Sequence, residues 1–579
     1  MQARTLCEAF QRTASADPDA VALRTPGGAV EITWREYGER VRRIAGGLAA
    51  LGVRRGDTVA LMMTNRPEFN LCDTAAVHLG ATPFSVYNTS PANQIAHVFE
   101  NADNRVVICE AAFLDQVTAA GGKVEHIVCV ERDVPGTIAL RDLEERRVDT
   151  FDFDAAWRAV GPEDVLTLIY TSGTTGPPKG VELTHANMLA EIEAMTAVLP
   201  VASSDRVVSY LPSAHVADRL LTHYLQMVLG PQITSVADLD RLVPSLIDVR
   251  PTVWVAVPRV WEKLKSALEA RIGAEPDADL RQTLQRAIAT GLRKVRAEQA
   301  AINGTGPGPD DEVLAEYHEA DARFLSAIRR QVGLDEVRWS ISGAAPISID
   351  VLEFFGAIGL PVCEGLGVSE LSGVVTVNPP GSTRLGTVGP ALPGVELMCT
   401  DDGELLCRGP LVMRGYRKEP KKTAEAIDAA GWLHTGDVAE IDADGYVRIV
   451  DRKKELIINA AGKNMSPTAI ESALKSASPL IGQAIAIGDR RPYNVALIVL
   501  DPEAAAGFVD DAARAAEVER AIAAANTRLA RVEQVKRYAI LDREWLPAGD
   551  ELTPTMKLKR GPIAQKYAAE IEALYAEPG

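Results

Sequence analysis

The segment from Tyr170 to Val181, Tyr-Thr-Ser-Gly-Thr-Thr-Gly-Pro-Pro-Lys-Gly-Val, has the composition of a loop that binds a polyphosphate. Its glycines allow several backbone N–H groups to face one anion, while hydroxyl side chains add donors and a lysine adds charge. The apolar run before it predicts a buried strand that positions the loop, which a flexible linker would lack. The residues that we expect to face the phosphates are Thr171, Ser172, Gly173, Thr174, Thr175, Gly176 and Lys179.

The loop differs from the Walker A loop of P-loop NTPases. That loop has Gly directly before its Lys and Ser or Thr directly after it, whereas this chain has Pro178 and Gly180 at those places. Two consecutive prolines also remove N–H donors and disfavour the helix start on which Walker A phosphates rest. We therefore exclude the P-loop NTPase class.

Two further segments of small residues follow predicted strands. In Ser340 to Pro346, small side chains could let a flat ring lie against the backbone, although a plain strand-to-helix turn is an equally good interpretation. The segment Glu364-Gly-Leu-Gly-Val-Ser-Glu370 ends in a carboxylate, a hard oxygen ligand that suits Mg²⁺. A nucleotide and a magnesium ion would thus find partners in both segments.

Polar groups at four other places could do chemistry. His215 lies in Leu211 to Arg219, where a lone histidine beside apolar residues is more often a core group. Asp437 ends Trp432 to Asp437 and could accept two ribose hydroxyls, although a turn aspartate is the simpler interpretation. The basic clusters at Asp451 to Ile457 and Leu552 to Arg560 would usually be solvated surface.

Taken together and in this order, the motifs resemble those of the adenylate-forming superfamily of acyl-CoA synthetases, luciferases and peptide-synthetase adenylation domains. The resemblance extends from about residue 10 to 570. Leu366 and Ser369 replace the usual Tyr and Thr, and Ile458 stands where many relatives have Lys. The segments Val257 to Lys263 and Leu552 to Arg560 look most like long-chain fatty acyl-CoA synthetases.

The resemblance implies a fatty acid–CoA ligase that uses ATP, Mg²⁺ and coenzyme A and passes through an acyl-adenylate. It assigns catalysis to His215 and Lys557, with Lys454 as a hinge residue, and the metal to Thr171 and Glu370. It implies further nucleotide or coenzyme contacts at Gly343, Ala344, Ala345, Glu364, Gly365, Leu366, Gly367, Ser369, Asp437, Arg452, Gly462 and Lys463. The alternatives are a fatty acyl-AMP ligase, an aryl or medium-chain acyl-CoA synthetase, and a non-catalytic protein that binds acyl nucleotides.

Composition bounds the class of protein. At 579 residues the chain is too long for one core. A net charge of −18 argues against nucleic-acid binding, which requires a basic face. We find neither a long apolar run nor a signal sequence, and the seven cysteines are scattered, so we expect the cytoplasm. Peripheral membrane contact and a homodimer stay open.

Alternating helix and strand patterns predict an α/β fold with two domains. We expect a large N-terminal domain at 1–451, formed by layered α/β subdomains, with a helical insert at about 261–330 and a β-rich part at about 386–451. The insert should contain a break at Asn303 to Asp311, where Gly, Pro and Asp gather. A small, mobile C-terminal α/β domain should follow at 452–579.

Overall fold

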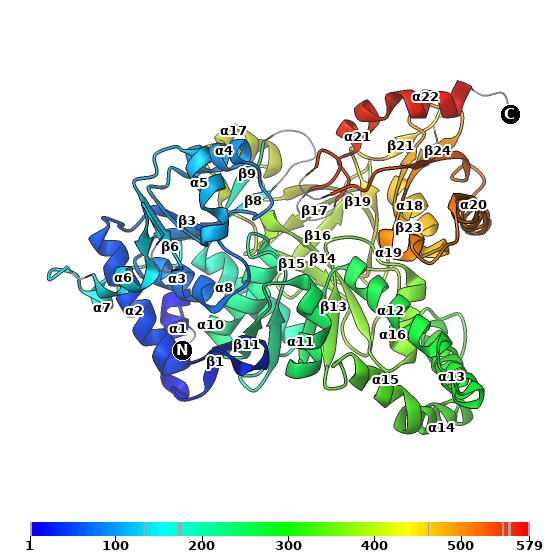
Figure 1. Ribbon diagram of the computed structural model, residues 1–579, viewed down its shortest axis with the longest axis horizontal. Helices are drawn as coiled ribbons and strands as arrows, with labels where there is room; N and C mark the ends of the chain where they lie inside the picture. Colours follow the sequence, from blue (N-terminus) through cyan, green and yellow to red (C-terminus); the bar gives the residue numbers. More distant parts are fainter. Residues whose placement is uncertain are drawn as a thin grey trace.

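The computed structural model describes residues 3–131, 134–146, 148–171, 177–460, 463–546, 549–553 and 557–576. It shows a large N-terminal part of layered α/β structure and a smaller C-terminal part (Figure 1). The predicted fold class is therefore confirmed.

An eight-stranded sheet forms the first layer. Six adjacent strands run parallel. At one edge the next strand is antiparallel to its neighbours on both sides, so the outermost strand again runs in the direction of the six. In spatial order the strands are β18 (Gly415–Tyr416), β9 (Lys179–Thr184), β8 (Val165–Thr171), β4 (Thr82–Ser85), β3 (Thr58–Met62), β5 (Val106–Cys109), β6 (His126–Cys129) and β7 (Ile138–Ala139). The helices of this region are α1 (Leu6–Ala16), α2 (Trp34–Ala50), α3 (Pro67–His78), α4 (Ala92–Ala102), α5 (Leu114–Ala120) and α8 (His185–Val198).

Two four-stranded sheets complete the α/β layers. One has the order β10 (Arg206–Ser209), β11 (Gln232–Ser235), β1 (Val21–Arg24) and β2 (Glu31–Thr33). The other has the order β12 (Val253–Ala256), β13 (Trp339–Ser342), β14 (Val362–Val368) and β15 (Gly373–Val377). The eight-stranded sheet and the sheet that contains β1 and β2 each combine strands that are far apart in the sequence. The layers therefore do not follow the order of the chain.

Local sequence explains several element boundaries. The Thr33 side chain accepts a hydrogen bond from the Glu36 N–H and caps α2, as the pattern predicts. The β-rich part contains β16 (Glu396–Cys399), β17 (Glu404–Arg408), β19 (Leu433–Ile441) and β20 (Val447–Arg452) in one antiparallel sheet. The turn between β19 and β20 contains Asp442 and Gly445, where the sequence predicts a hairpin.

The insert is more divided than a two-helix hairpin. It consists of α12 (Pro258–Gly273), α13 (Ala278–Ile302), α14 (Asp311–Ala320), a π-helical turn and α15 (Ser326–Gln331). The predicted break after Ile302 is present. A second break, which we did not predict from the sequence, separates α12 from α13. Pro276 lies in this break, and Asp277 caps α13.

The C-terminal part is a small α/β unit. Its strands are β21 (Ile457–Ile458), β22 (Asn464–Met465), β23 (Ile481–Ile487), β24 (Asn494–Leu500) and β25 (Val535–Leu541). Its helices are α18 (Pro467–Ala477), α19 (Pro502–Ala505), α20 (Asp511–Arg528), α21 (Arg560–Lys566) and α22 (Ala568–Ala576). Among the described residues, no helix has the length and apolar character needed to cross a membrane.

Candidate active site

The predicted phosphate loop joins the antiparallel strands β8 and β9. Thr171 and Lys179 face each other at the open end of this pair. Ser172, Gly173, Thr174, Thr175 and Gly176 lie outside the described residues. The two strands thus fix both ends of the loop at one point of the large sheet.

Lys179 connects this loop to the predicted magnesium ligand. Its Nζ lies 3.9 Å from the centre of the Tyr416 ring, in a cation–π contact. The Tyr416 hydroxyl in turn donates a hydrogen bond of 2.9 Å to Glu370 Oε1. Burial lowers the pKa of Lys179, an effect that the Glu370 charge opposes and the charges of Lys422 and Lys454 reinforce. A partly desolvated lysine and a carboxylate therefore meet beside the loop.

The two small-residue segments also come together. Strands β13 and β14 are parallel neighbours, so the turn after Ser342 lies next to the segment that begins at Glu364. A Cβ added to Gly343 would lie 3.4 Å from the Gly365 carbonyl oxygen. Ala344 has a φ of 69°, unusual for a residue with a side chain, and both Ala344 and Ala345 are exposed. This arrangement leaves an open backbone surface against which a flat ring could lie.

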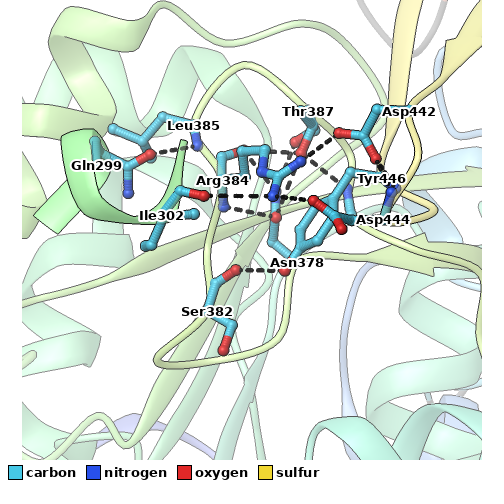
Figure 2. Close-up of polar contacts among 11 residues, drawn as sticks. Gln299, Ile302, Asn378, Ser382, Arg384, Leu385, Thr387, Asp442, Asp444 and Tyr446 are labelled. Atoms are coloured by element: carbon cyan, nitrogen blue, oxygen red, sulfur yellow. Dashed lines mark hydrogen bonds and ion pairs between the residues drawn. The ribbon is translucent and has the colours of Figure 1, made fainter. Parts of the chain in front are cut away.

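Figure 2 shows a network around Arg384, which joins its loop to the β19–β20 turn and to the end of α13. The Arg384 guanidinium binds Asp442 and Asp444 in the β19–β20 turn and reaches a main-chain carbonyl at the end of α13. Two residues later, Gly386 N–H donates a 2.9 Å hydrogen bond to Glu364 Oε2. Burial raises the pKa of Glu364 to about 8. The insert and the β-rich sheet thus jointly hold the strand that carries the predicted adenine contacts.

Asp437 and Arg452, both predicted at the ribose, form a direct ion pair. They face each other in the β19–β20 pair, with 2.8 Å between Arg452 Nε and Asp437 Oδ1. Asp437 is buried, and desolvation raises its pKa, while the charges of Arg452 and Lys557 act in the opposite direction. Arg452 remains exposed. The carboxylate is thus oriented by one cation and approached by another.

Lys557 brings the C-terminal part into this cluster. Its side chain keeps contact with solvent, yet the surrounding protein desolvates the ammonium and lowers its pKa, an effect that the Arg452 charge reinforces. Asp437, Glu455 and Glu370 oppose that shift, which places their charges within range of the lysine. Two acids of the N-terminal part, Glu370 and Asp437, therefore interact electrostatically with a lysine of the C-terminal part.

The charge of Lys557 also acts on His215. Burial lowers its pKa to about 4, and the charge of Lys557 adds to that shift, so the imidazole is neutral near pH 7. Its Nδ1 accepts a hydrogen bond from the Ala217 N–H, which assigns the ring proton to Nε2. The imidazole can thus donate one hydrogen bond to a group bound beside Lys557.

Three predicted residues have different surroundings. Lys454 is exposed just after β20, close enough for its charge to affect Lys179. Leu366 and Ser369 are half-buried on the Glu364 segment, at and just after β14.

The predicted coenzyme segment begins the C-terminal part. Lys463 lies in the β21–β22 turn, where its N–H donates to Asn459 Oδ1, and Gly462 lies outside the described residues. No contact given by the described part of the chain joins Lys463 to the Lys557 cluster.

Two residues that interact with the predicted site residues, Tyr416 and Glu455, were not predicted from the sequence. Tyr416 contacts both Lys179 and Glu370, and Glu455 places a carboxylate near Lys557. The only signal for Tyr416 was an aromatic residue within the basic run Arg414 to Lys418, and a two-residue edge strand gives no periodicity to detect.

Comparison with known proteins identifies the family. Residues 10–417 match the AMP-binding enzyme family, and residues 454–578 match the AMP-binding enzyme C-terminal domain. The chain belongs to the AMP-binding enzymes. Among its relatives, the protein named "Putative fatty-acid--CoA ligase fadD11" of Mycobacterium tuberculosis is 54% identical over 456 residues, which cover 76% of this chain and 79% of that protein. "Long-chain-fatty-acid--CoA ligase FadD15" of the same species is 33% identical and covers 96% of this chain and 95% of its own length.

Solved structures show the same fold. An anthranilate CoA ligase, AuaEII, in complex with anthranoyl-AMP superposes with a TM-score of 0.75 over 98% of both chains at 20% identity. The adenylation domain of a carboxylic acid reductase from Segniliparus rugosus, in complex with AMP and a carboxylic acid, gives a TM-score of 0.78 at 21% identity.

Asp437→Ala should weaken ATP binding by about 10- to 100-fold, because a hydrogen bond to a charged group contributes about 1.5 to 3 kcal/mol. Isothermal titration calorimetry with ATP measures the effect. Glu440→Ala is the matched control, since Glu440 is an exposed acid on the same strand, β19, and takes no part in the Arg384 network. Equal losses in both variants would contradict a nucleotide contact at Asp437.

Proposed function

We propose that the chain is a long-chain fatty acid–CoA ligase. The proposed reaction converts a fatty carboxylate, ATP and coenzyme A into acyl-CoA, AMP and pyrophosphate through an acyl-adenylate. The observation that carries the proposal is the group of charges beside the predicted phosphate loop, where Arg452 Nε lies 2.8 Å from Asp437 Oδ1 and Tyr416 links Lys179 to Glu370. The names of the relatives support fatty acids as the substrate class.

The first step is attack of the fatty carboxylate on the α-phosphorus of ATP, with pyrophosphate as the leaving group. Because the nucleophile is already ionised, the site needs positioning and charge stabilisation and no general base. In this proposal Lys557 stabilises negative charge on the α-phosphate oxygens, Asp437 and Arg452 hold the ribose, and His215 orients the carboxylate through Nε2–H. Lys179 and the loop before it hold the departing pyrophosphate.

Glu370 and Thr171 are the proposed holders of Mg²⁺. The hydroxyl of Tyr416 fixes the orientation of the Glu370 carboxylate, which is the role of outer partners at metal sites. A carboxylate with phosphates as the remaining ligands is the donor set that Mg²⁺ prefers, so the residues fit the ion. Once bound, it neutralises charge on the phosphates.

In the second step, the coenzyme A thiol attacks the acyl carbonyl and AMP leaves. We propose the boundary between residues 451 and 452, with Lys454 as the hinge about which the C-terminal part rotates between the two steps. Rotation would remove Lys557 and present Gly462 and Lys463 to the coenzyme. A cytoplasmic location belongs to the same proposal.

For the acyl chain, we propose the region between Trp254 and Trp261 as an apolar wall. Both indoles are fully buried, with ring centres 4.6 Å apart, and Phe355 packs against Trp261. Each methylene of a bound chain contributes roughly 0.8 kcal/mol when it leaves water, so a long apolar site selects long acids. We expect a preference for acids of about twelve carbons or more.

The product assay tests this proposal. Pyrophosphate and AMP should form with Mg-ATP, coenzyme A and a long-chain acid, and the rate should rise along a series from acetate to a twenty-carbon acid. Formation of ADP would contradict the proposal, and best activity on acetate or benzoate would contradict the substrate class. Full turnover without coenzyme A would favour an acyl-AMP ligase, and no pyrophosphate with any acid would favour a non-catalytic binding protein.

The pH dependence of adenylate formation tests the role of Lys557. The charged lysine is the active form and its pKa is lowered, so the rate should fall at a lower alkaline pH than an unperturbed lysine would give. Lys557→Arg should reduce the rate yet move this alkaline limb upward, because a guanidinium stays protonated. His215 adds no step near neutrality, since its pKa is about 4. Stopped-flow single turnovers from pH 6 to about 10.5 measure the alkaline fall in rate in the wild type and in Lys557→Arg. If the rate falls at the same pH in both proteins, Lys557 is not the group that titrates.

A further inference from the structure

The two parts of the chain on either side of the hinge have separate hydrophobic cores. In the part that the structure describes, three buried clusters contain only residues up to Ile449. Two others contain only residues from Ile457 onward. Because no described cluster spans both parts, polar contacts must contribute much of what holds Lys557 at the site.

Lys557 itself provides little of that attachment. Its ammonium interacts electrostatically with Asp437 and Glu370, but forms no ion pair within 4.0 Å with any described residue. It also keeps contact with solvent. Other contacts between the two parts must therefore position the lysine.

Away from the hinge residues 452–455, Arg259 and Asp501 form the most buried of the ion pairs between the two parts that the described residues give. Arg259 is the second residue of α12, and its guanidinium binds Asp501 Oδ2 at the start of α19. The side chains are 34% and 13% exposed, so water screens this pair less than a surface pair. In Figure 1, α19 lies beside α12 at the contact between the two parts.

Both residues are held by their own helices. Arg259 Nη1 lies 3.6 Å from Glu262 Oε2 of α12, while its Nη2 binds Asp501. Asp501 Oδ1 accepts hydrogen bonds of 3.1 Å from the N–H groups of Glu503 and Ala504, which fixes the carboxylate and leaves Oδ2 for Arg259. Strand β12 leads directly into α12 and pairs with β13. Arg259 is therefore positioned by the same sheet as the turn after Ser342, where we expect the adenine ring to lie; we call this the adenine turn.

Two exposed pairs lie along the same contact. Lys263 Nζ lies 3.6 Å from Glu503 Oε2, one turn farther along α12. Arg528 of α20 lies 3.1 Å from Asp350 in the first turn of α16 (Ile349–Ala357), which follows the turn after Ser342. Exposed pairs of this kind each contribute little.

We propose that Arg259 and Asp501 are positioning residues for acyl-adenylate formation. Their ion pair holds the C-terminal part in the arrangement that brings Lys557 to Asp437 and Glu370, and it must break before the C-terminal part rotates for thioester formation. This inference rests on the proposed function. Loss of the pair lowers the population with Lys557 in place, so it slows the first half-reaction and leaves the second unchanged or faster.

Single-turnover kinetics of both half-reactions test the pair in Arg259→Gln, Asp501→Asn and the double variant. Asp501→Asn retains the side-chain oxygen that caps α19 and removes the charge. We expect each variant to slow adenylate formation by about three- to tenfold, where tenfold corresponds to about 1.4 kcal/mol. The double variant should be no slower than either single variant, because both remove the same interaction. Thioester formation from pre-made acyl-adenylate should not slow.

Lys265→Gln is the matched control. Lys265 lies on the same helix and pairs with Glu269 of that helix, so its loss should leave both half-reactions unchanged. Unchanged adenylation in both single variants, equal slowing of both half-reactions, or additive effects in the double variant would each overturn the proposal. Wild-type protein that releases no pyrophosphate with any acid would instead contradict the proposed function.

Cross-linking gives a second measurement that needs no activity. Lys263→Cys and Glu503→Cys place exposed thiols beside the pair, in a Cys399→Ser background that removes an exposed native cysteine. A short bis-maleimide should link them in high yield, and adding Arg259→Gln should lower that yield, whereas adding Lys265→Gln should not. The linked protein should still form acyl-adenylate but no thioester. Equal yields in all backgrounds, or thioester formation at the unlinked rate, would overturn the proposal.

Discussion

The electrostatic interaction of Lys557 with Asp437 and Glu370 is the interaction on which the rest of the site depends. The lysine belongs to the C-terminal part and the acids belong to the N-terminal part, so the cluster exists only while the two parts are correctly placed. Desolvation lowers the lysine pKa and raises that of Asp437, because burial disfavours the charged form of each group. In our proposal, the negative phosphates of the bound nucleotide offset this cost for the lysine, and the ribose hydroxyls donate hydrogen bonds to Asp437.

Three sheets fix the N-terminal half of that site. The β8–β9 pair sets the ends of the phosphate loop, β13 and β14 set the two small-residue segments, and the β19–β20 pair sets Asp437 against Arg452. The Arg384 network joins the last two (Figure 2), because it ties the β19–β20 turn to the loop that donates to Glu364. A substitution in the β-rich sheet can therefore displace the adenine turn, even where the substituted residue does not contact the nucleotide.

The sequence predicted what local chemistry determines. The run before Thr171 is apolar and forms a buried strand, and Asp442 to Gly445 form a hairpin turn, because both patterns depend on neighbours along the chain. Comparison confirms the family resemblance, from which we predicted that Asp437, Arg452, His215 and Lys557 share one site. It did not reveal Tyr416 or the pair of Arg259 with Asp501, since these contacts join segments far apart in sequence and follow no periodicity. The second break of the insert at Pro276 was missed because abundant helix formers surround it.

The most direct test of the central claim is to separate the two half-reactions in Lys557→Ala. If Lys557 acts only while it faces Asp437 and Glu370, single-turnover adenylate formation should slow by roughly 10²- to 10³-fold, the usual effect of losing one charge-stabilising donor. Conversion of pre-made acyl-adenylate and coenzyme A to thioester should continue at the wild-type rate. Proportional loss of both half-reactions in a protein that remains folded by circular dichroism would contradict the account.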